Sequence, residues 1–258
     1  MTAYGKLAAL NRAIAETIAI LASEQDARAE IHIAVITFGG DGANFHQHIQ
    51  QSRPNEDAWM GMSGAFGTAI VISDGMGSKL NARIGAQMAC RAVRNALKPW
   101  AKSENAPAAT LLRLVHLFWG LRVLPQKEED SAATCVFVAV LPSGQLTIAQ
   151  LGDGIAAIRN ADGSLEILQG ERQGFTNQTT GLGIAKTTKD WTVIAKPALS
   201  PNAEVLLATD GIADDLVADR IRDFIHTLVT EFGSMAPTAR RHALHREDQK
   251  LGYSQPPR

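Results

Sequence analysis

An Asp-Gly step ends apolar, strand-like runs at more than one place in this chain, and this repetition constrains the fold more than any other feature. Asp74-Gly75 follows one such run, Asp210-Gly211 follows another, and Gly152-Asp153-Gly154 follows a third. A single Asp-Gly step is usually a turn, because Gly tolerates positive φ and Asp bonds nearby backbone. Several steps that each end a buried strand can gather carboxylates at one edge of a sheet. Mg²⁺ and Mn²⁺ prefer such oxygen ligands, so the leading hypothesis is a metal-dependent phosphoryl enzyme.

Composition sets the broad class of the protein. The chain has 258 residues, 45% of them hydrophobic, which is enough for a substantial core in one or two domains. The formal charge of −1 provides no global field to attract nucleic acid or an anionic membrane. Cys90 and Cys135 lack the spacing of a zinc site or a disulfide framework, so we expect two reduced core residues. No secretory signal is visible and the apolar segment Leu111–Leu124 is too short to span a membrane, so we expect a cytoplasmic protein without a membrane partner.

Hydrophobic periodicity predicts a mixture of helices and antiparallel strands. Two hairpins are expected, because strand-like runs flank short polar turns at Pro142-Ser143-Gly144 and at residues 160–163. Strand hairpins separated by pairs of helices indicate an α+β layered fold rather than a doubly wound parallel sheet. The expected helices are 7–23, 82–97, 111–124 and 216–232, and the expected strands are 31–38, 68–73, 134–141, 145–151, 155–159 and 165–168.

An ordered set of short motifs resembles the protein phosphatase 2C family, and in particular its bacterial-type branch. His46 or His48 before the acidic pair, and residues 175–179 midway along the chain, look like additional signatures of that branch. The motifs that carry the resemblance are Asn55-Glu56-Asp57-Ala58, Ser73-Asp74-Gly75-Met76-Gly77, Gly85-Ala86, Leu151-Gly152-Asp153 and Ala208-Thr209-Asp210-Gly211. The resemblance implies a four-layer αββα sandwich of two mainly antiparallel sheets. It also implies serine/threonine phosphoprotein phosphatase activity, a phosphoserine or phosphothreonine protein as substrate, and a cognate protein kinase as a partner.

The resemblance also implies roles for individual residues. Asp74 looks like the carboxylate that bridges two Mn²⁺ or Mg²⁺ ions, with the backbone carbonyl of Gly75 as a neighbouring ligand. Asp210 looks like a ligand of one metal, and the pair Glu56-Asp57 resembles the acidic pair that holds the other metal or its waters. Asp153 is similar to the residue that supports a weaker third metal, although Gly152-Asp153-Gly154 would equally make a tight turn. Asp57, Asp74 and Asp210 are the expected catalytic residues.

The implied chemistry explains why carboxylates dominate this set. Two divalent cations can lower the pKa of a bridging water, present it in line with phosphorus and neutralise the phosphoryl oxygens, so no protein nucleophile is needed. A general acid must still protonate the leaving oxygen. Some relatives place a His directly after the first Asp-Gly, whereas this chain has Met76, so water or an unassigned His is expected to act.

Three features depart from the family pattern. Arg53 is the candidate for binding substrate phosphate, but it is one residue closer to Asp57 than the family's Arg, and a solvated loop charge is the alternative. The chain lacks the late Asp-Asp or Asp-Asn step that supplies the final metal carboxylate, so it resembles a C-terminally truncated phosphatase domain. Residues 34–40 weakly resemble part of a von Willebrand factor A domain. The alternative is that the N-terminal segment is a helix and an edge strand that extend the phosphatase sheet. The expected division is residues 1–40 as an N-terminal helix and strand, 41–235 as the phosphatase-like domain, and 236–258 as a polar tail.

Three functions therefore remain open from the sequence. The first is a metal-dependent serine/threonine phosphatase. The second is a catalytically impaired, phosphatase-like binding or regulatory protein that lacks the last metal carboxylate. The third is a protein-interaction module built on the partial A-domain resemblance.

Overall fold

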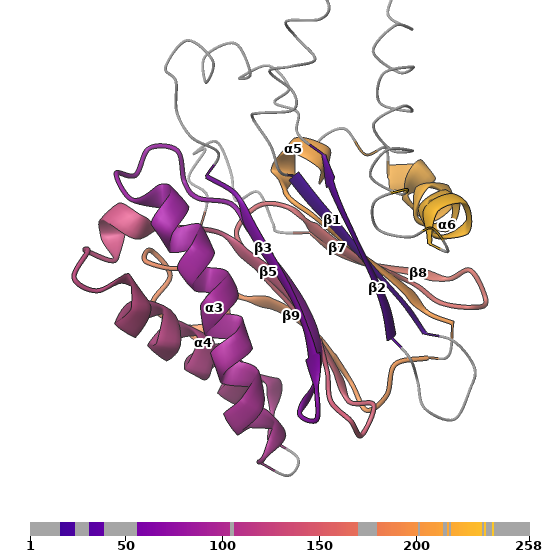
Figure 1. Ribbon diagram of the computed structural model, residues 1–258, viewed down its shortest axis with the longest axis horizontal. Helices are drawn as coiled ribbons and strands as arrows, with labels where there is room; N and C mark the ends of the chain where they lie inside the picture. Colours follow the sequence, from indigo (N-terminus) through magenta and orange to yellow (C-terminus); the bar gives the residue numbers. More distant parts are fainter. Residues whose placement is uncertain are drawn as a thin grey trace, which may run out of the picture.

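The computed structural model describes residues 16–23, 31–38, 56–103, 106–169, 180–200, 202–213, 216, 218–233, 235 and 239. Two five-stranded antiparallel sheets form the centre of the fold (Figure 1). One sheet, called here the β4 sheet, has the order β3 (Ala58–Gly64), β4 (Gly67–Ser73), β5 (Cys135–Val140), β6 (Leu146–Leu151), β9 (Thr192–Lys196). The other, the β10 sheet, has the order β2 (Ile31–Phe38), β1 (Glu16–Ser23), β10 (Glu204–Ala208), β7 (Ile155–Arg159), β8 (Leu165–Gln169).

Helices cover the outer face of each sheet. The helices α3 (Ala82–Ala101) and α4 (Ala108–Val123) pack against each other, and α3 contacts β3, β4 and β5. On the other side, α6 (Ile221–Phe232) packs on β10 and β1, and the short helix α5 (Asp210–Ala213) follows β10 directly. Three 3₁₀ turns complete the described elements: η1 (Glu129–Ser131), η2 (Thr188–Asp190) and η3 (Ala218–Arg220). No helix among the described residues is long and apolar enough to cross a membrane.

The central strands β4, β5, β6, β7 and β10 are buried on both faces, and this double burial produces the four layers. Along β5, Phe137 points into an apolar cluster with α3 and α4, whereas Val136 and Val138 point into the cluster between the sheets. Along β10, Leu207 joins the cluster between the sheets and Leu206 joins the cluster under α6. Three successive apolar layers therefore separate four structural layers, and the architecture is the αββα sandwich that the sequence predicted.

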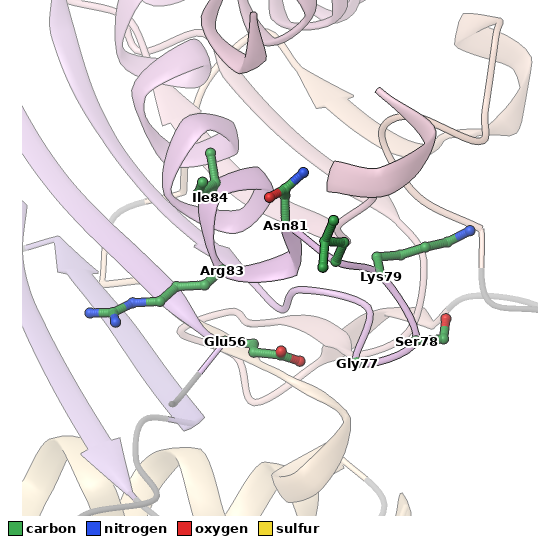
Figure 2. A pocket seen from close by; sticks show the side chains of 8 residues that line it. Glu56, Gly77, Ser78, Lys79, Asn81, Arg83 and Ile84 are labelled. Carbon is green, nitrogen blue, oxygen red and sulfur yellow. The ribbon is translucent and has the colours of Figure 1, made fainter. Parts of the chain in front are cut away.

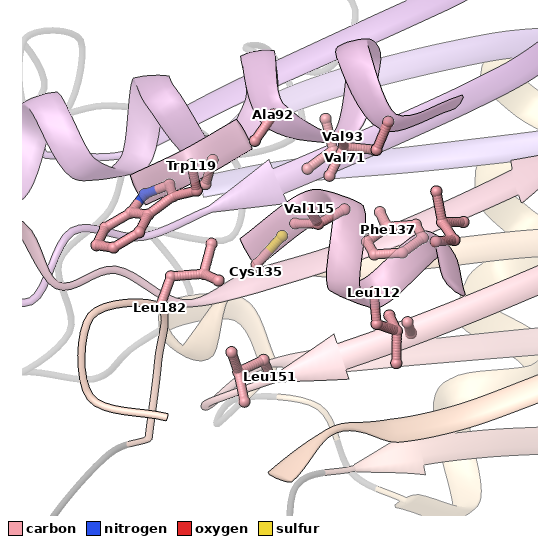
Figure 3. Close-up of a cluster of buried hydrophobic side chains, with 14 of the residues drawn as sticks. Val71, Ala92, Val93, Leu112, Val115, Trp119, Cys135, Phe137, Leu151 and Leu182 are labelled. Carbon is pink, nitrogen blue, oxygen red and sulfur yellow. The ribbon is translucent and has the colours of Figure 1, made fainter. Parts of the chain in front are cut away.

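Small residues bring α3 close to its neighbours. The buried face of α3 is dominated by alanine, and α4 adds Leu112, Val115 and Trp119 to the same cluster (Figure 3). Gly85 lies against η1 so closely that a Cβ there would stand 1.7 Å from the backbone oxygen of Ser131. The carbonyl oxygen of Gly85 also accepts a hydrogen bond of 3.0 Å from Trp119 Nε1. This contact gives a physical reason for a glycine in the Gly85-Ala86 motif.

The helix expected over residues 7–23 is wrong for residues 16–23, which form β1. Residues 7–15 lie outside the described part of the chain. The apolar spacing of this segment fits a helix, but Thr17, Ile18 and Ile20 are β-branched and favour strands. All eight residues of β1 pair with β2, and four of them also pair with β10. Pairing on both sides outweighs the local helical period, and it places residues 16–38 in the same sheet as β10, β7 and β8.

Other expectations hold with shifted boundaries. The strand over 31–38 and both hairpins are confirmed, and the helix expected over 82–97 continues to Ala101. The helix expected over 216–232 begins at Ile221, after η3. On α4, Arg113 and Arg122 are exposed, and Leu121 is 58% exposed although it fits the apolar period of the helix. The strands β3 and β9 were not predicted.

Candidate active site

Strand register brings the three Asp-Gly steps to one end of the sandwich. Ile72 pairs with Val136 and Cys135 pairs with Leu151, so the C-terminal ends of β4 and β6 lie at the same end of their sheet. In the other sheet, Ala208 at the end of β10 pairs with Ile155 at the start of β7. The loops that carry Asp74, Asp153 and Asp210 therefore leave the two sheets at a common end.

The acidic pair Glu56-Asp57 reaches this end through β3. Ala58 pairs with Ser73, which places the two acidic residues beside the loop that follows β4. The Gly75 N–H donates a hydrogen bond of 3.2 Å to the Glu56 carbonyl oxygen. Pairing of β3 with β4 thus joins two motifs that are separated by a hairpin in the sequence.

Thr134 fixes the backbone on which Asp74 stands. The Asp74 N–H donates to Thr134 Oγ1 at 2.9 Å, and the Thr134 N–H donates to the Asp74 carbonyl oxygen at 2.8 Å. Ser73 Oγ donates to the Thr134 carbonyl oxygen at 2.5 Å. These hydrogen bonds join residues about sixty positions apart in the sequence; they satisfy the polar backbone where β4 ends and fix the backbone that carries the Asp74 carboxylate.

The turn that carries Asp153 is held by Gln150 and by two glycines. Gln150 Nε2 donates to the carbonyl oxygens of Gly152 and Gly154, at 3.1 and 2.9 Å. Gly154 has a φ of +115°, and a Cβ there would stand 2.7 Å from the Ala208 carbonyl oxygen. Glycine is therefore required for this turn to approach the end of β10, two residues before Asp210.

Four of the predicted carboxyl groups interact electrostatically. Burial raises the pKa of Asp74 well above its usual value, and the negative charge of Asp57, a hydrogen bond with Asp57, and the charges of Asp210 and Glu56 raise the pKa further. The fold thus brings Glu56, Asp57, Asp74 and Asp210 together, as the motif order predicted. Asp153 lies at the same end of the sheets as these four residues, but it is not among the groups that raise the pKa of Asp74.

The chemistry of this donor set fits a hard divalent cation. Like charges around a buried carboxylate disfavour its ionised form, and a divalent cation offsets that repulsion while accepting carboxylate and carbonyl oxygens as ligands. The side chains as they stand do not form a finished coordination site, because no group of three or more His, Cys, Asp or Glu in the described part of the chain is arranged to hold a metal ion.

A pocket of about 460 Å³ opens beside Glu56, and sequence reasoning missed its lining residues other than Glu56 and Gly77. Figure 2 shows Glu56, Lys79, Asn81 and Arg83 around this pocket, with the charged ends of Lys79 and Arg83 pointing away from each other. Lys79, Asn81 and Arg83 belong to the loop after Asp74 and to the first turn of α3. The signal in the sequence was the presence of two cations, Lys79 and Arg83, within eight residues after the Asp74-Gly75 step.

Several predicted residues lie outside the described part of the chain. These are Arg53, His46, His48 and the segment 175–179.

Comparison with known proteins identifies a family for this sequence and similar structures for this fold. A sequence model of the family described as protein phosphatase 2C matches residues 46–247. No curated protein matches the sequence.

Many solved structures are similar to this chain, and two of them illustrate the likeness. One is the photosystem II phosphatase PBCP, with a TM-score of 0.53 and 17% identity, covering 77% of this chain and 73% of that one. Another is a bacterial serine phosphatase, with a TM-score of 0.50 and 18% identity, covering 75% of this chain and 85% of that one. At these identities the two structures support the fold.

Proposed function

Because the chain belongs to the protein phosphatase 2C family, we propose that it is a serine/threonine phosphoprotein phosphatase that depends on Mn²⁺ or Mg²⁺. The observation that carries this proposal is the convergence of Asp57, Asp210 and Glu56 on the half-buried Asp74 at one end of the sandwich. A phosphorylated side chain of a protein substrate is the proposed reactant, and a protein kinase is the proposed source of that substrate.

Each residue of the cluster has a proposed role. Asp74 would bridge two metal ions with the Gly75 carbonyl oxygen nearby, Asp210 would bind one ion, and Glu56 with Asp57 would bind the other or its waters. Asp153 would support a weaker third ion. When bound, the metals would supply an activated water and neutralise the phosphoryl oxygens.

The remaining contributions come from the protein itself. Thr134 holds the Asp74 backbone through the hydrogen bonds described above, so the bridging carboxylate would be oriented before substrate arrives. The pocket beside Glu56 would admit the phosphorylated side chain, with Lys79 and Arg83 close enough to attract an anion. Arg53 remains the proposed phosphate ligand from the sequence.

The test is hydrolysis of a phosphothreonine peptide by the purified full chain with Mn²⁺ or Mg²⁺. We expect activity that is abolished by a chelator and reduced at least about a hundredfold in Asp74→Asn, because one bridging ligand supports both ions. Asp162→Asn is a matched control, since Asp162 is exposed in the β7–β8 turn and an Asn can also accept the Ser164 N–H. Activity that survives both the chelator and Asp74→Asn would refute the proposed metal centre.

A second candidate is a phosphatase-like protein that binds phosphoproteins without turnover. The observation that favours it is the lack of a three-ligand metal group in the described part of the chain. Under this alternative, the folded chain would bind the phosphothreonine peptide and release no phosphate with either metal. Metal-dependent turnover lost in Asp74→Asn would exclude it.

A further inference from the structure

The helix α3 carries a row of positive charge that the proposed chemistry does not use. From Gly75 to Ser103 the sequence contains six Lys or Arg residues and no Asp or Glu. Five of these cations, which we call the basic row, are exposed on α3 or at its C-terminal cap: Arg83, Arg91, Arg94, Lys98 and Lys102. At 3.6 residues per turn the five positions fall within an arc of about 100°, so they form one stripe along the helix.

This stripe differs from an ordinary solvated helix face. Surface helices usually intersperse both signs of charge, with opposite charges three or four residues apart. In the basic row, Arg91, Arg94 and Lys98 follow one another at those spacings, and like charges so placed destabilise a helix. None of the five forms an ion pair with another residue in the described ranges. Arg83 also lies in the first helical turn, where the helix dipole disfavours a cation.

The position of the row connects it to the candidate active site. Arg83 lines the pocket beside Glu56 (Figure 2). Figure 1 shows α3 starting at the end of the sheets where α5 lies and running along the outside toward the opposite end. The row therefore begins at the pocket with Arg83 and, after about two helical turns without a cation, continues away from it from Arg91 to Lys102.

We propose that the basic row is a docking track for an acidic segment of the phosphoprotein substrate. This inference rests on the proposed function, because it identifies what the same site would act on. From Arg83 to Lys102 the helix rises about 28 Å, a length that roughly eight or nine residues of an extended chain would span. A substrate with several Asp or Glu residues within about eight positions of its phosphorylated side chain would place opposite charge along the whole row.

Other anionic partners fit the row less well. Single-stranded nucleic acid binds where aromatic side chains alternate with cations, and the one aromatic residue of α3, Trp100, is fully buried. A membrane surface is bound by a basic helix that also inserts large apolar side chains, and in α3 only Ile84 among these is exposed, at 36%. An acidic polypeptide can bind the cations of the basic row without aromatic or large apolar side chains on α3.

The test measures binding separately from turnover. Two labelled phosphothreonine peptides are compared by fluorescence anisotropy with a chelator present: one has glutamates within about eight positions of the phosphothreonine, and the other has glutamines there. Each peptide is made with the flanking segment on either side, because the row does not fix the chain direction. We expect the wild-type chain to bind the acidic peptide about five- to tenfold more tightly than the neutral one, a preference that falls with added salt.

The variants locate this preference. Arg91→Glu/Arg94→Glu should abolish the preference for the acidic peptide and leave binding of the neutral peptide unchanged. Lys189→Glu/Arg222→Glu, a matched control on exposed residues away from α3, makes the same change in net charge and should keep it. Equal binding of the two peptides by the wild-type chain, or equal loss in both variants, would overturn the proposal. Binding of phosphatidylserine vesicles without any peptide preference would also overturn it, in favour of a membrane surface.

Turnover distinguishes this inference from the proposed function. Hydrolysis of p-nitrophenyl phosphate with Mn²⁺ should be the same in wild type and in Arg91→Glu/Arg94→Glu, because neither arginine lines the pocket. If the wild-type chain hydrolysed nothing but kept the peptide preference, the phosphatase proposal would fail and the docking track would stand.

Discussion

Replacing Gly85 with alanine tests whether the contact between α3 and η1 holds the sandwich together. A Cβ at this position would stand 1.7 Å from the Ser131 oxygen and 2.7 Å from its carbonyl carbon, so backbone must move by more than an ångström. Overpacking of this kind costs about 1–3 kcal/mol, and loss of the Trp119–Gly85 hydrogen bond adds about 1 kcal/mol. The higher helix propensity of alanine returns up to about 1 kcal/mol. We therefore expect Gly85→Ala to lower the free energy of unfolding by about 2–3 kcal/mol.

The assay is urea unfolding followed by circular dichroism, in which such a loss lowers the midpoint by about 1 M. Gly120→Ala is the matched control, since Gly120 also lies in a helix but its Cβ would meet only the flexible carboxylate end of Glu128, at 2.8 Å. We expect Gly120→Ala to be neutral or to stabilise by up to about 1 kcal/mol. If Gly85→Ala were as stable as Gly120→Ala, the close contact with Ser131 would not constrain the fold and the reasoning would be refuted.

Three further predictions follow from buried or paired groups. Thr134→Val removes the hydroxyl that bonds the backbone at the end of β4, so we expect a loss of about 1–3 kcal/mol in urea unfolding and slower phosphopeptide hydrolysis. Hydrogen bonds from Lys196 and Asn160, together with the charge of Lys196, lower the pKa of the Glu166 carboxyl, so the ionised carboxylate stabilises the fold above the ordinary glutamate pKa and loses this effect as pH falls through the lowered one. Glu166→Gln should therefore cost under about 1 kcal/mol at pH 7, and the cost should shrink as the pH is lowered, as measured by unfolding at a series of pH values. Burial raises the pKa of the Cys90 and Cys135 thiols, so a thiol reagent should label neither in the native protein and both in urea; rapid native labelling would contradict their burial.

The sequence predicted the layered α+β fold because its central strands carry strong local signals. Apolar runs bounded by polar turns identified β4, β5, β6, β7 and β8, and the ordered carboxylate motifs identified four residues that the fold does bring together. In contrast, β3 contains two glycines and two methionines, and its identity as a strand depends on pairing with β4 along its whole length. The roles proposed for these four residues, and those of Asp153 and Arg53, stay predictions.

By itself, the sequence predicted the carboxylates that the fold brings together, because carboxylates after apolar runs are readable from residue type and order. The tertiary structure alone decided that residues 16–23 are a strand, since pairing on both sides overrides a helical period. It also decided that Glu56 lies beside Gly75 and that Gly85 must lack a side chain. These facts arise from contacts between residues distant in the chain, and no local periodicity encodes such contacts.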